Sequence, residues 1–294
     1  MQYNVKSIDS NYDFVISGVS YIGKPQDYTM MYISKKVEQL INNLEGIKCC
    51  LVFAEKGISV PDNIKKNNCI VFTDNPQLDY AKCANEIDSK NRDSEKLVLT
   101  EEGYYIGNNV RIGKNAYIEP NVVIGSDCII GNNATLLCGA VIRNSVIGDN
   151  FLTNEYAVIG SNGFTMAEDV LGNKIRIPSL GKVVIKDNVE IGAFDNISRG
   201  SAGNTQIDNN VKIDAHVHIG HDAHLEENTE ITAGAIIGGF VEAGVHSYVG
   251  INAVVRNRKK LGENSFVGMG AVVTKSVDDN TVVVGNPAKE FRKG

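Results

Sequence analysis

The stretch IDNNVKIDAHVHIGHDAHLEENTEITAGAIIGG (residues 207–239) decides the fold, because a large aliphatic side chain returns in it at every sixth residue. The same count continues to Val273 with a single position, Ala243, that is not Ile, Leu or Val. Small or β-branched side chains recur four residues after most of these positions. Helices and strands have other periods, so the pattern indicates a structural unit of six residues. The large positions are Ile207, Ile213, Ile219, Leu225, Ile231, Ile237, Ala243, Val249, Val255, Leu261, Val267 and Val273.

The repeat extends upstream and covers residues 103–275 with interruptions. It runs from Ile106 to Ile142, slips by one residue, resumes at Ile147 and returns once more between Ile185 and Ile197. One large and one small inward side chain per unit fit a prism of short parallel strands. Gly, Asn or Asp turns each corner, and three sides complete a coil of about 18 residues. We therefore predict a mainly β fold, a parallel β-helix over residues 103–275.

Two insertions interrupt the repeat, GSNGFTMAEDVLGNKIRIPSLGKV (160–183) and ISRGSAGNTQI (197–207). A solenoid extrudes insertions as loops on one face, which is often the binding face. We therefore expect both insertions to lie near any functional site.

The N-terminal region, residues 1–95, has a different pattern. A helix capped by Ser34 and ending at Gly46 is predicted there, and CCLVFAE (49–55) and CIVFT (69–73) are typical of buried strands. Pro76 can open a second helix that reaches about Ile87. The pattern predicts a small α/β domain.

The two ends of the repeat are predicted from composition. The polar run DSKNRDSEK (88–96) is predicted to be the linker into the β-helix. Residues 276–294 lack the six-residue frame, and Pro287 limits regular structure there, so we expect a C-terminal extension.

Composition excludes several classes of protein. The net charge is −6 and no basic tail is present, which argues against nucleic-acid binding. The first residues lack the pattern of a signal peptide, and no long apolar run predicts an integral membrane segment. The 6 cysteines show no paired metal spacing and fit a reducing compartment. We expect a cytoplasmic protein.

The repeat resembles the left-handed parallel β-helix of hexapeptide-repeat acyltransferases. The order of SNGF (161–164), KIRIPSLGKV (174–183), VEIGAFDNISRG (189–200) and KIDAHVHIGHD (212–222) is similar to the UDP-3-O-acylglucosamine N-acyltransferase family of lipid A synthesis. The resemblance implies a nucleotide-binding N-terminal domain, a homotrimer, no bound cofactor, and an acyl thioester of coenzyme A or acyl carrier protein as co-substrate.

The chain departs from that family at three places. The segment TMMYISKKV (29–37) does not securely match the aromatic residue, the Asn and the Tyr with which the family holds uridine. Ser198 stands where the family has an acidic residue. The family's second active-site histidine aligns near Arg258. These departures favour another UDP- or dTDP-linked amino sugar as acceptor, with lipid A acylation as an alternative.

A second resemblance adds further candidate activities. HIGHDAHLEENTEITAGAIIGG (218–239) and GNPAK (285–289) look like sugar acetyltransferases, so O- or N-acetylation of a free or lipid-linked sugar is a further alternative. An alternative of another class is a non-catalytic assembly or sugar-sensing module.

Four of the 5 histidines lie in HVHIGHDAH (216–224), and none occupies an inward position of the repeat. A metal site is one hypothesis, because a zinc-dependent carbonic anhydrase family shares this fold and the spacing of His216 and His221. That family needs a third histidine on an earlier coil, and the chain has none before His216. We therefore predict no metal, and expect His224 and His246 to be solvated.

His221 is the predicted general base, since an imidazole that titrates near neutrality can deprotonate a sugar amine. The aligned histidine is the catalytic base in both resembling families. Asp222 is expected to support it at best, because adjacent side chains in a strand point apart. Gly239, one coil later, is a candidate oxyanion donor through its N–H, or else an ordinary turn glycine.

The remaining candidates form two groups. The first group would bind the sugar or its phosphates, and the second, from RNRKK (256–260), would bind the acyl carrier or be a solvated turn. The first group is His216, His218, Ser198, Arg199, Asn204 and Phe164, and the second is Arg256, Arg258, Lys259 and Lys260.

Overall fold

The computed structural model describes residues 2–94 and 96–293, which form two compact units. The larger unit is a parallel β-helix of residues 96–163, Lys182–Gly200 and 204–293. The smaller unit combines the N-terminal residues with Phe164–Gly181 and Ser201–Gly203 from the two insertions. Most of the first insertion and three residues of the second therefore complete the small unit.

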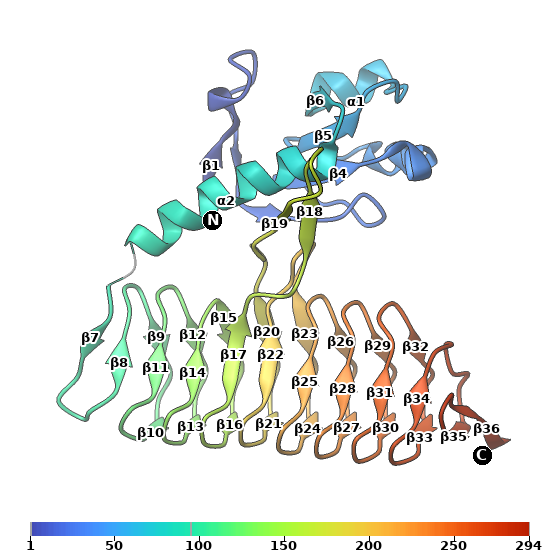
Figure 1. The fold of residues 1–294 in the computed structure, drawn as a ribbon. Coiled ribbons are helices and arrows are strands. Elements are labelled where there is room, and N and C mark those ends of the chain that lie inside the picture. The colour runs from blue at the N-terminus through green and yellow to red at the C-terminus, as the bar shows by residue number, and fades with distance from the viewer. Residues whose placement is uncertain (1, 95, 294) are drawn as a thin grey trace. The chain divides into compact units, whose positions relative to one another are not determined.

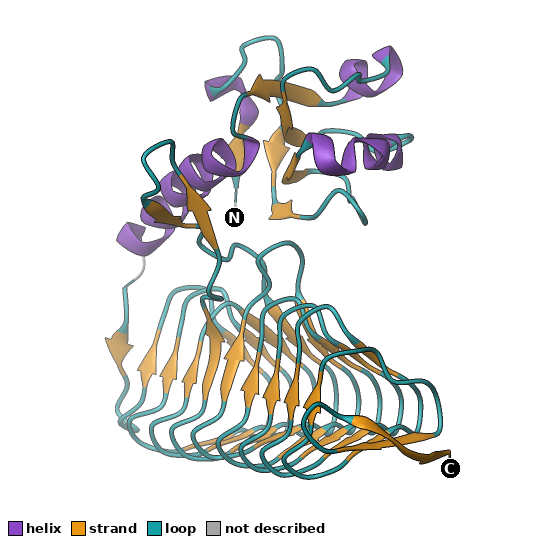
Figure 2. Ribbon diagram, turned by 45° about the vertical axis from the view of Figure 1, so that its right-hand side comes forward, coloured by secondary structure: helices purple, strands orange, loops and turns teal. Residues whose placement is uncertain are grey.

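Three sheets form the faces of the β-helix, with successive coils stacked in parallel (Figures 1 and 2). Facing residues such as His218 and Ile236 lie one coil apart. The first face comprises β8 (Tyr105–Ile106), β11 (Val123–Ile124), β14 (Val141–Ile142), β17 (Val158–Ser161), β22 (Asn196–Ser198), β25 (His218–Ile219), β28 (Ile236–Ile237), β31 (Val254–Val255) and β34 (Val272–Val273). β7 (Val98–Leu99) adds an antiparallel strand at its N-terminal edge.

The second and third faces continue each coil. The second comprises β9 (Arg111–Ile112), β12 (Ile129–Ile130), β15 (Ser145–Ile147), β20 (Val183–Ile185), β23 (Thr205–Ile207), β26 (His224–Leu225), β29 (Glu242–Ala243) and β32 (Lys260–Leu261). The third comprises β10 (Tyr117–Ile118), β13 (Thr135–Leu136), β16 (Leu152–Thr153), β21 (Glu190–Ile191), β24 (Lys212–Ile213), β27 (Glu230–Ile231), β30 (Tyr248–Val249), β33 (Phe266–Val267) and β35 (Thr281–Val284).

The six-residue frame fills the interior as predicted. Large positions such as Ile219 and Ile237 are completely buried, and so are the small positions Ala223 and Ala235. Side chains of both sizes therefore pack inside one continuous core.

The corners are turned by residues in the left-handed conformation. Asn dominates these positions, since its side chain tolerates positive φ better than most. On the corner between the first and second faces, Asp222, Phe240 and Arg258 take this conformation in consecutive coils, with φ of 60, 59 and 59°. The side chains flanking this corner are therefore displayed outward.

The small unit is built on a parallel sheet ordered β3 (Gly18–Val19), β4 (Thr29–Ile33), β5 (Leu51–Glu55) and β6 (Cys69–Thr73). Its helices are α1 (Asp62–Asn67), α2 (Pro76–Ser94) and the 3-10 helices η1 (Val5–Ser7) and η2 (Lys35–Leu44). Two antiparallel pairs join it: β1 (Tyr3–Asn4) with β2 (Val15–Ile16), and β18 (Met166–Glu168) with β19 (Lys174–Arg176). The inserted hairpin buries Ala167 and Ile177 in the same core as α2.

Three local predictions were wrong in detail. The proposed linker is helical up to Ser94, and two i,i+4 ion pairs, Lys90 with Glu86 and Arg92 with Asp88, support this end of α2. The Ser34 side chain makes no capping hydrogen bond, and the helix that follows is of the 3-10 type.

The C-terminal extension is more regular than predicted. β35 stacks in parallel on β33 and turns back into β36 (Lys289–Lys293) as an antiparallel hairpin. Pro287 lies in the turn between these strands and removes no ladder hydrogen bond there.

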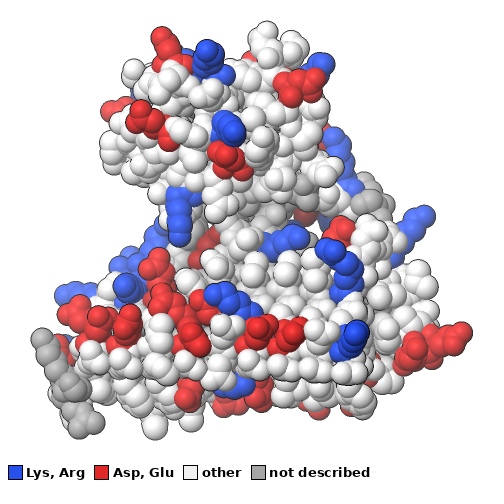
Figure 3. Space-filling model, turned by 180° about the vertical axis from the view of Figure 1, so that it is seen from behind, with Lys and Arg blue, Asp and Glu red and all other residues white. Residues whose placement is uncertain are grey.

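On the rear face of the coils, Figure 3 shows acidic side chains in a band, with basic side chains interspersed. Within residues 2–94 and 96–293, no helix has both the length and the apolar character needed to cross a bilayer.

Candidate active site

His221 lies at the corner that follows β25, and its imidazole is held by Asp222. Nδ1 of His221 is 2.7 Å from Oδ2 of Asp222, and the two side chains are 20% and 5% exposed. The expectation that these neighbours point apart was wrong, because Asp222 occupies a left-handed corner position and not an extended strand. A carboxylate at Nδ1 favours the tautomer that carries its proton there, which leaves Nε2 as the proton acceptor.

The backbone of Asp222 is fixed by a buried hydroxyl group. The Asp222 N–H donates to Oγ1 of Thr205 at 2.9 Å, and this hydroxyl donates to the Ser198 carbonyl at 2.7 Å. Thr205 is completely buried. The second insertion thus contains a residue that fixes the backbone of Asp222, a role that the sequence pattern did not indicate.

Two glycines flank the imidazole. A Cβ on Gly239 would lie 3.0 Å from both Cε1 and Nε2 of His221, and a Cβ on Gly163 would lie 2.8 Å from Cδ2. Among the described residues, no acceptor is bonded to the Gly239 N–H. An unbonded N–H on the residue beside Nε2 is a candidate donor for a developing oxyanion. Gly163 was not predicted, although it lies in the quoted SNGF motif.

His218 lies near His221 on the outer side of β25, between Asn196 and Ile236 of the neighbouring coils. Burial lowers its pKa, and the nearby His221 lowers it further. Asn196 accepts a hydrogen bond from Ser161 at 3.2 Å and one from Ser198 at 3.5 Å. The predicted residues His218 and Ser198 therefore share a polar strip beside the imidazole.

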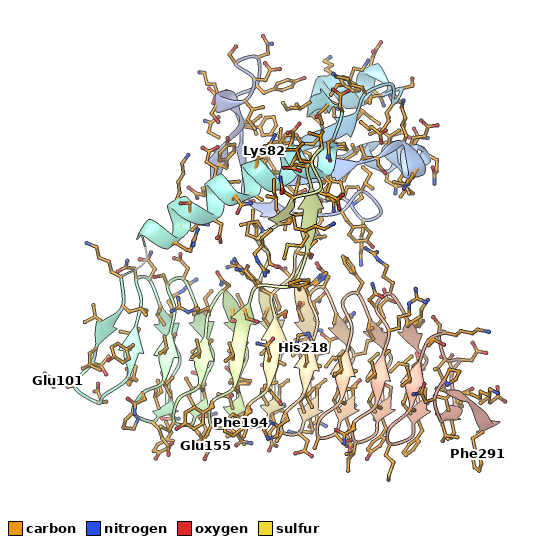
Figure 4. All side chains as sticks on the ribbon, viewed as in Figure 1. Lys82, Glu101, Glu155, Phe194, His218 and Phe291 are labelled. Atoms are coloured by element: carbon orange, nitrogen blue, oxygen red, sulfur yellow. The ribbon has the colours of Figure 1, made fainter. Side chains whose placement is uncertain are left out.

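His216 lies at a different corner. Its ring stacks on Phe194 with centroids 5.1 Å apart, and Phe194 stacks on Tyr156. Five residues of nearly extended chain separate His216 from His221, about 16 Å at 3.3 Å per residue. Figure 4 shows Phe194 at the lower corner of the coil and His218 on the face above it. The structure does not bring His216 to the imidazole of His221.

Three further predicted residues have local partners. Arg199 is 8% exposed and donates through Nε and Nη2 to Oδ1 of Asn162, at 3.2 and 2.9 Å. Asn204 accepts the Lys182 N–H at 2.9 Å. Phe164 belongs to the small unit, where it is 79% exposed and faces Arg176.

The basic run (256–260) lies at the same corner as His221, about two coils further along the β-helix. The guanidinium of Arg258 lies 4.1 Å from the Phe240 ring centroid, and this ring meets His221 edge-on at 5.3 Å. Arg256 and Lys260 are exposed and Lys259 is half-exposed. Positive charge is therefore displayed within two coils of the imidazole.

Histidine and acidic side chains are dispersed over the faces. His224 pairs with Asp208 on the second face at 3.0 Å. In the part of the chain that the structure describes, no three His, Cys, Asp or Glu side chains are placed to hold a metal ion.

Similar proteins carry the same repeat. The family model described as bacterial transferase hexapeptide (six repeats) matches residues 103–138 and 204–239. A UDP-3-O-acylglucosamine N-acyltransferase of Helicobacter pylori (strain HPAG1) is 33% identical over 252 residues, 82% of this chain and 74% of that protein. A protein of the same name from Coxiella burnetii (strain Dugway 5J108-111) is 42% identical over 93 residues, 32% of this chain and 27% of its own length.

Solved structures agree with this relationship. UDP-N-acetylglucosamine acyltransferase from Campylobacter jejuni superposes with a TM-score of 0.59 and 25% identity, over 66% of this chain and 74% of that one. The Francisella novicida enzyme of that name gives a TM-score of 0.56 and 27% identity, over 66% of each chain. The left-handed parallel β-helix implied by the resemblance is confirmed. The chain is an acyltransferase and belongs to the UDP-3-O-acylglucosamine N-acyltransferase family of hexapeptide-repeat proteins.

Proposed function

We propose that the protein transfers an acyl group from a thioester to the amine of a nucleotide-linked amino sugar, with His221 as general base. The observation that carries the proposal is the geometry of one imidazole. Asp222 holds Nδ1 at 2.7 Å, and Nε2 lies beside Gly239, whose N–H has no acceptor among the described residues. A base and a candidate oxyanion donor thus lie side by side, as acyl transfer requires.

The reaction follows from these two groups. The uncharged amine attacks the thioester carbonyl while Nε2 of His221 takes the amine proton. The carbonyl oxygen becomes an oxyanion, which the Gly239 N–H stabilises. When the intermediate collapses, the C–S bond breaks, the proton passes from His221 to the thiolate, and an amide and a free thiol leave.

The family relationship indicates the first acceptor to test. The Helicobacter pylori relative bears the name UDP-3-O-acylglucosamine N-acyltransferase, and it aligns with most of this chain. The departures at Ser198, Arg258 and residues 29–37 favour a different UDP- or dTDP-linked amino sugar. We propose that the small unit binds the nucleotide and that His218 contacts the sugar.

The donor is proposed to be an acyl thioester of coenzyme A or acyl carrier protein. Both carry phosphate or carboxylate groups, which the exposed Arg256, Arg258 and Lys260 would attract. We further propose, from the family resemblance, that the enzyme works as a homotrimer in the cytoplasm.

His221→Ala tests the function. Purified enzyme is incubated with UDP- and dTDP-linked amino sugars and with acetyl or longer acyl thioesters, and products are read by mass. We expect wild-type protein to acylate at least one sugar and the variant to lose about 1,000-fold or more in kcat. Unchanged acylation by the variant would overturn the assignment. Sugar binding without acylation by wild-type protein would favour a non-catalytic module.

A second candidate is O-acylation, since both solved relatives are named UDP-N-acetylglucosamine acyltransferases. The same imidazole can take a proton from a hydroxyl group. Mild alkali separates the two products, because an ester is cleaved and an amide survives. An alkali-labile product would replace the N-acyl proposal and leave the role of His221 intact.

A further inference from the structure

The chain at Gly163 leaves the regular path of the β-helix. Ser161 still pairs with Ser198 in the first face, and β17 lies two strands from β25. Two strand spacings amount to about 9.6 Å. A Cβ on Gly163 would nevertheless lie 2.8 Å from Cδ2 and 2.9 Å from Cβ and Cγ of His221. The first insertion therefore begins by crossing the intervening coil and ends that crossing on the imidazole.

A buried cation holds this crossing in place. Arg199 lies on the coil that is crossed, is 8% exposed, and donates from Nε and Nη2 to the side-chain oxygen of Asn162. The Arg199 N–H also donates to the Ser161 carbonyl at 2.9 Å. A two-point hydrogen bond from a planar guanidinium fixes direction as well as distance. The residue before Gly163 is thus fixed from the side chain and the backbone.

The imidazole is enclosed on three sides as a result. Gly163 meets the Cβ, Cγ and Cδ2 edge, Gly239 meets Cε1 and Nε2, and Asp222 holds Nδ1. Gly163 is buried, and any larger residue there would force the ring or the crossing to move.

We infer that Gly163 is a positioning residue of the acyltransferase, with the Asn162–Arg199 bond as its support. It acts through His221 and touches no substrate. The inference rests on the proposed role of His221 and adds that the first insertion sets the direction of Nε2. It also assigns Arg199 to the positioning of His221.

Gly163→Ala is the direct test. A displacement of about 1 Å at a catalytic group costs on the order of 100-fold in rate. We expect kcat to fall by about that factor, while KM for both substrates changes less than about threefold. The chain has 5 histidines, so a ring ¹⁵N–¹H spectrum can resolve each one. The His221 signals, identified by their loss in His221→Ala, should shift.

Gly131→Ala is the matched control. A Cβ at Gly131 would also clash with the next coil, 2.5 Å from the Gly148 carbonyl, but at another corner. It should lower Tm and leave kcat and the His221 signals unchanged. If Gly163→Ala also changes only Tm, Gly163 is merely structural and the inference is wrong.

Asn162→Ala covers the case in which Gly163→Ala does not fold. It removes the acceptor of the Arg199 bond without adding bulk, so kcat should still fall with little change in KM. Unchanged kcat would overturn the inference. Full activity of His221→Ala would instead refute the proposed function, so the two failures are distinguishable.

Discussion

Two corners of the same β-helix use their backbone amides in opposite ways. At the corner between the second and third faces, Asn132 caps Lys114 N–H, Asp149 caps Asn132 N–H and Asp187 caps Asp149 N–H, at 2.7–2.9 Å. We call this the capped corner. At the position equivalent to Asn132, the His221 corner has Gly239, and no described residue accepts its N–H.

The difference separates stability from chemistry. Capped amides hold one coil on the next and leave no donor for a ligand. The His221 corner gives up such a cap, and Gly239 puts no side chain beside Nε2 of the imidazole. In this β-helix, one corner therefore stabilises the stacking of the coils, and another carries the candidate reaction site.

The largest effect is expected from Asp222→Asn. The amide cannot hold the His221 tautomer as a carboxylate does, so kcat should fall by about 1,000-fold. Steady-state kinetics and the His221 ring spectrum measure this change. Asp149→Asn, at the capped corner, should leave kcat unchanged. Equal activity of Asp222→Asn and wild-type protein would mean that the pair has no catalytic role.

A smaller loss, about 100-fold in kcat, is expected from Gly239→Ala. The added Cβ would lie 3.0 Å from Nε2 of His221, in the space proposed for the reacting carbonyl. At the equivalent capped position, Asn132→Ala should lower Tm and spare kcat. If Gly239→Ala and Asn132→Ala have the same effect on kcat, the proposed difference between the two corners is wrong.

The corner between the third and first faces contributes to stability through a buried carboxylate. There the buried Asp195 carboxylate accepts the Gly192 and Val217 N–H groups at 2.9 and 2.7 Å. Burial raises the pKa of Asp195 to about 7, although these hydrogen bonds oppose the rise. Since the folded pKa exceeds the unfolded one, the stabilisation is present at low pH and is lost as pH rises from about 4 to about 7.

The test compares wild-type protein with Asp195→Ala by urea unfolding at several pH values. The free-energy difference between them should shrink by on the order of 3 kcal/mol across that range. A difference that grows with pH would mean that the two N–H groups outweigh burial.

The smallest effect is expected from Arg258→Ala. This exposed cation stacks on Phe240 and is proposed to attract the acyl carrier. Its loss should raise KM for the donor about threefold, with less effect at high salt. Lys114→Ala, an exposed cation at the capped corner, is the control. If KM for the donor is unchanged at low salt, the basic run does not bind the acyl carrier and is a solvated turn.

Much of the fold and part of the candidate site could be predicted from local sequence patterns. The six-residue frame predicted the core because each inward position depends on its own unit, and it placed every histidine outside the core. The prediction that His221 and Asp222 point apart failed because it assumed a strand, whereas Asp222 turns a corner. The linker prediction failed because polar composition does not distinguish a solvated helix from a loop.

By itself, the sequence determined the β-helix, the small α/β unit and His221 as the candidate base, since period, composition and motif order are local properties of the chain. Tertiary structure alone decided what surrounds that imidazole. It brought Gly163 across a coil, separated His216 by the width of a face, and placed most of the first insertion in the small unit. Such contacts depend on where the chain crosses itself, and no repeat period encodes a crossing.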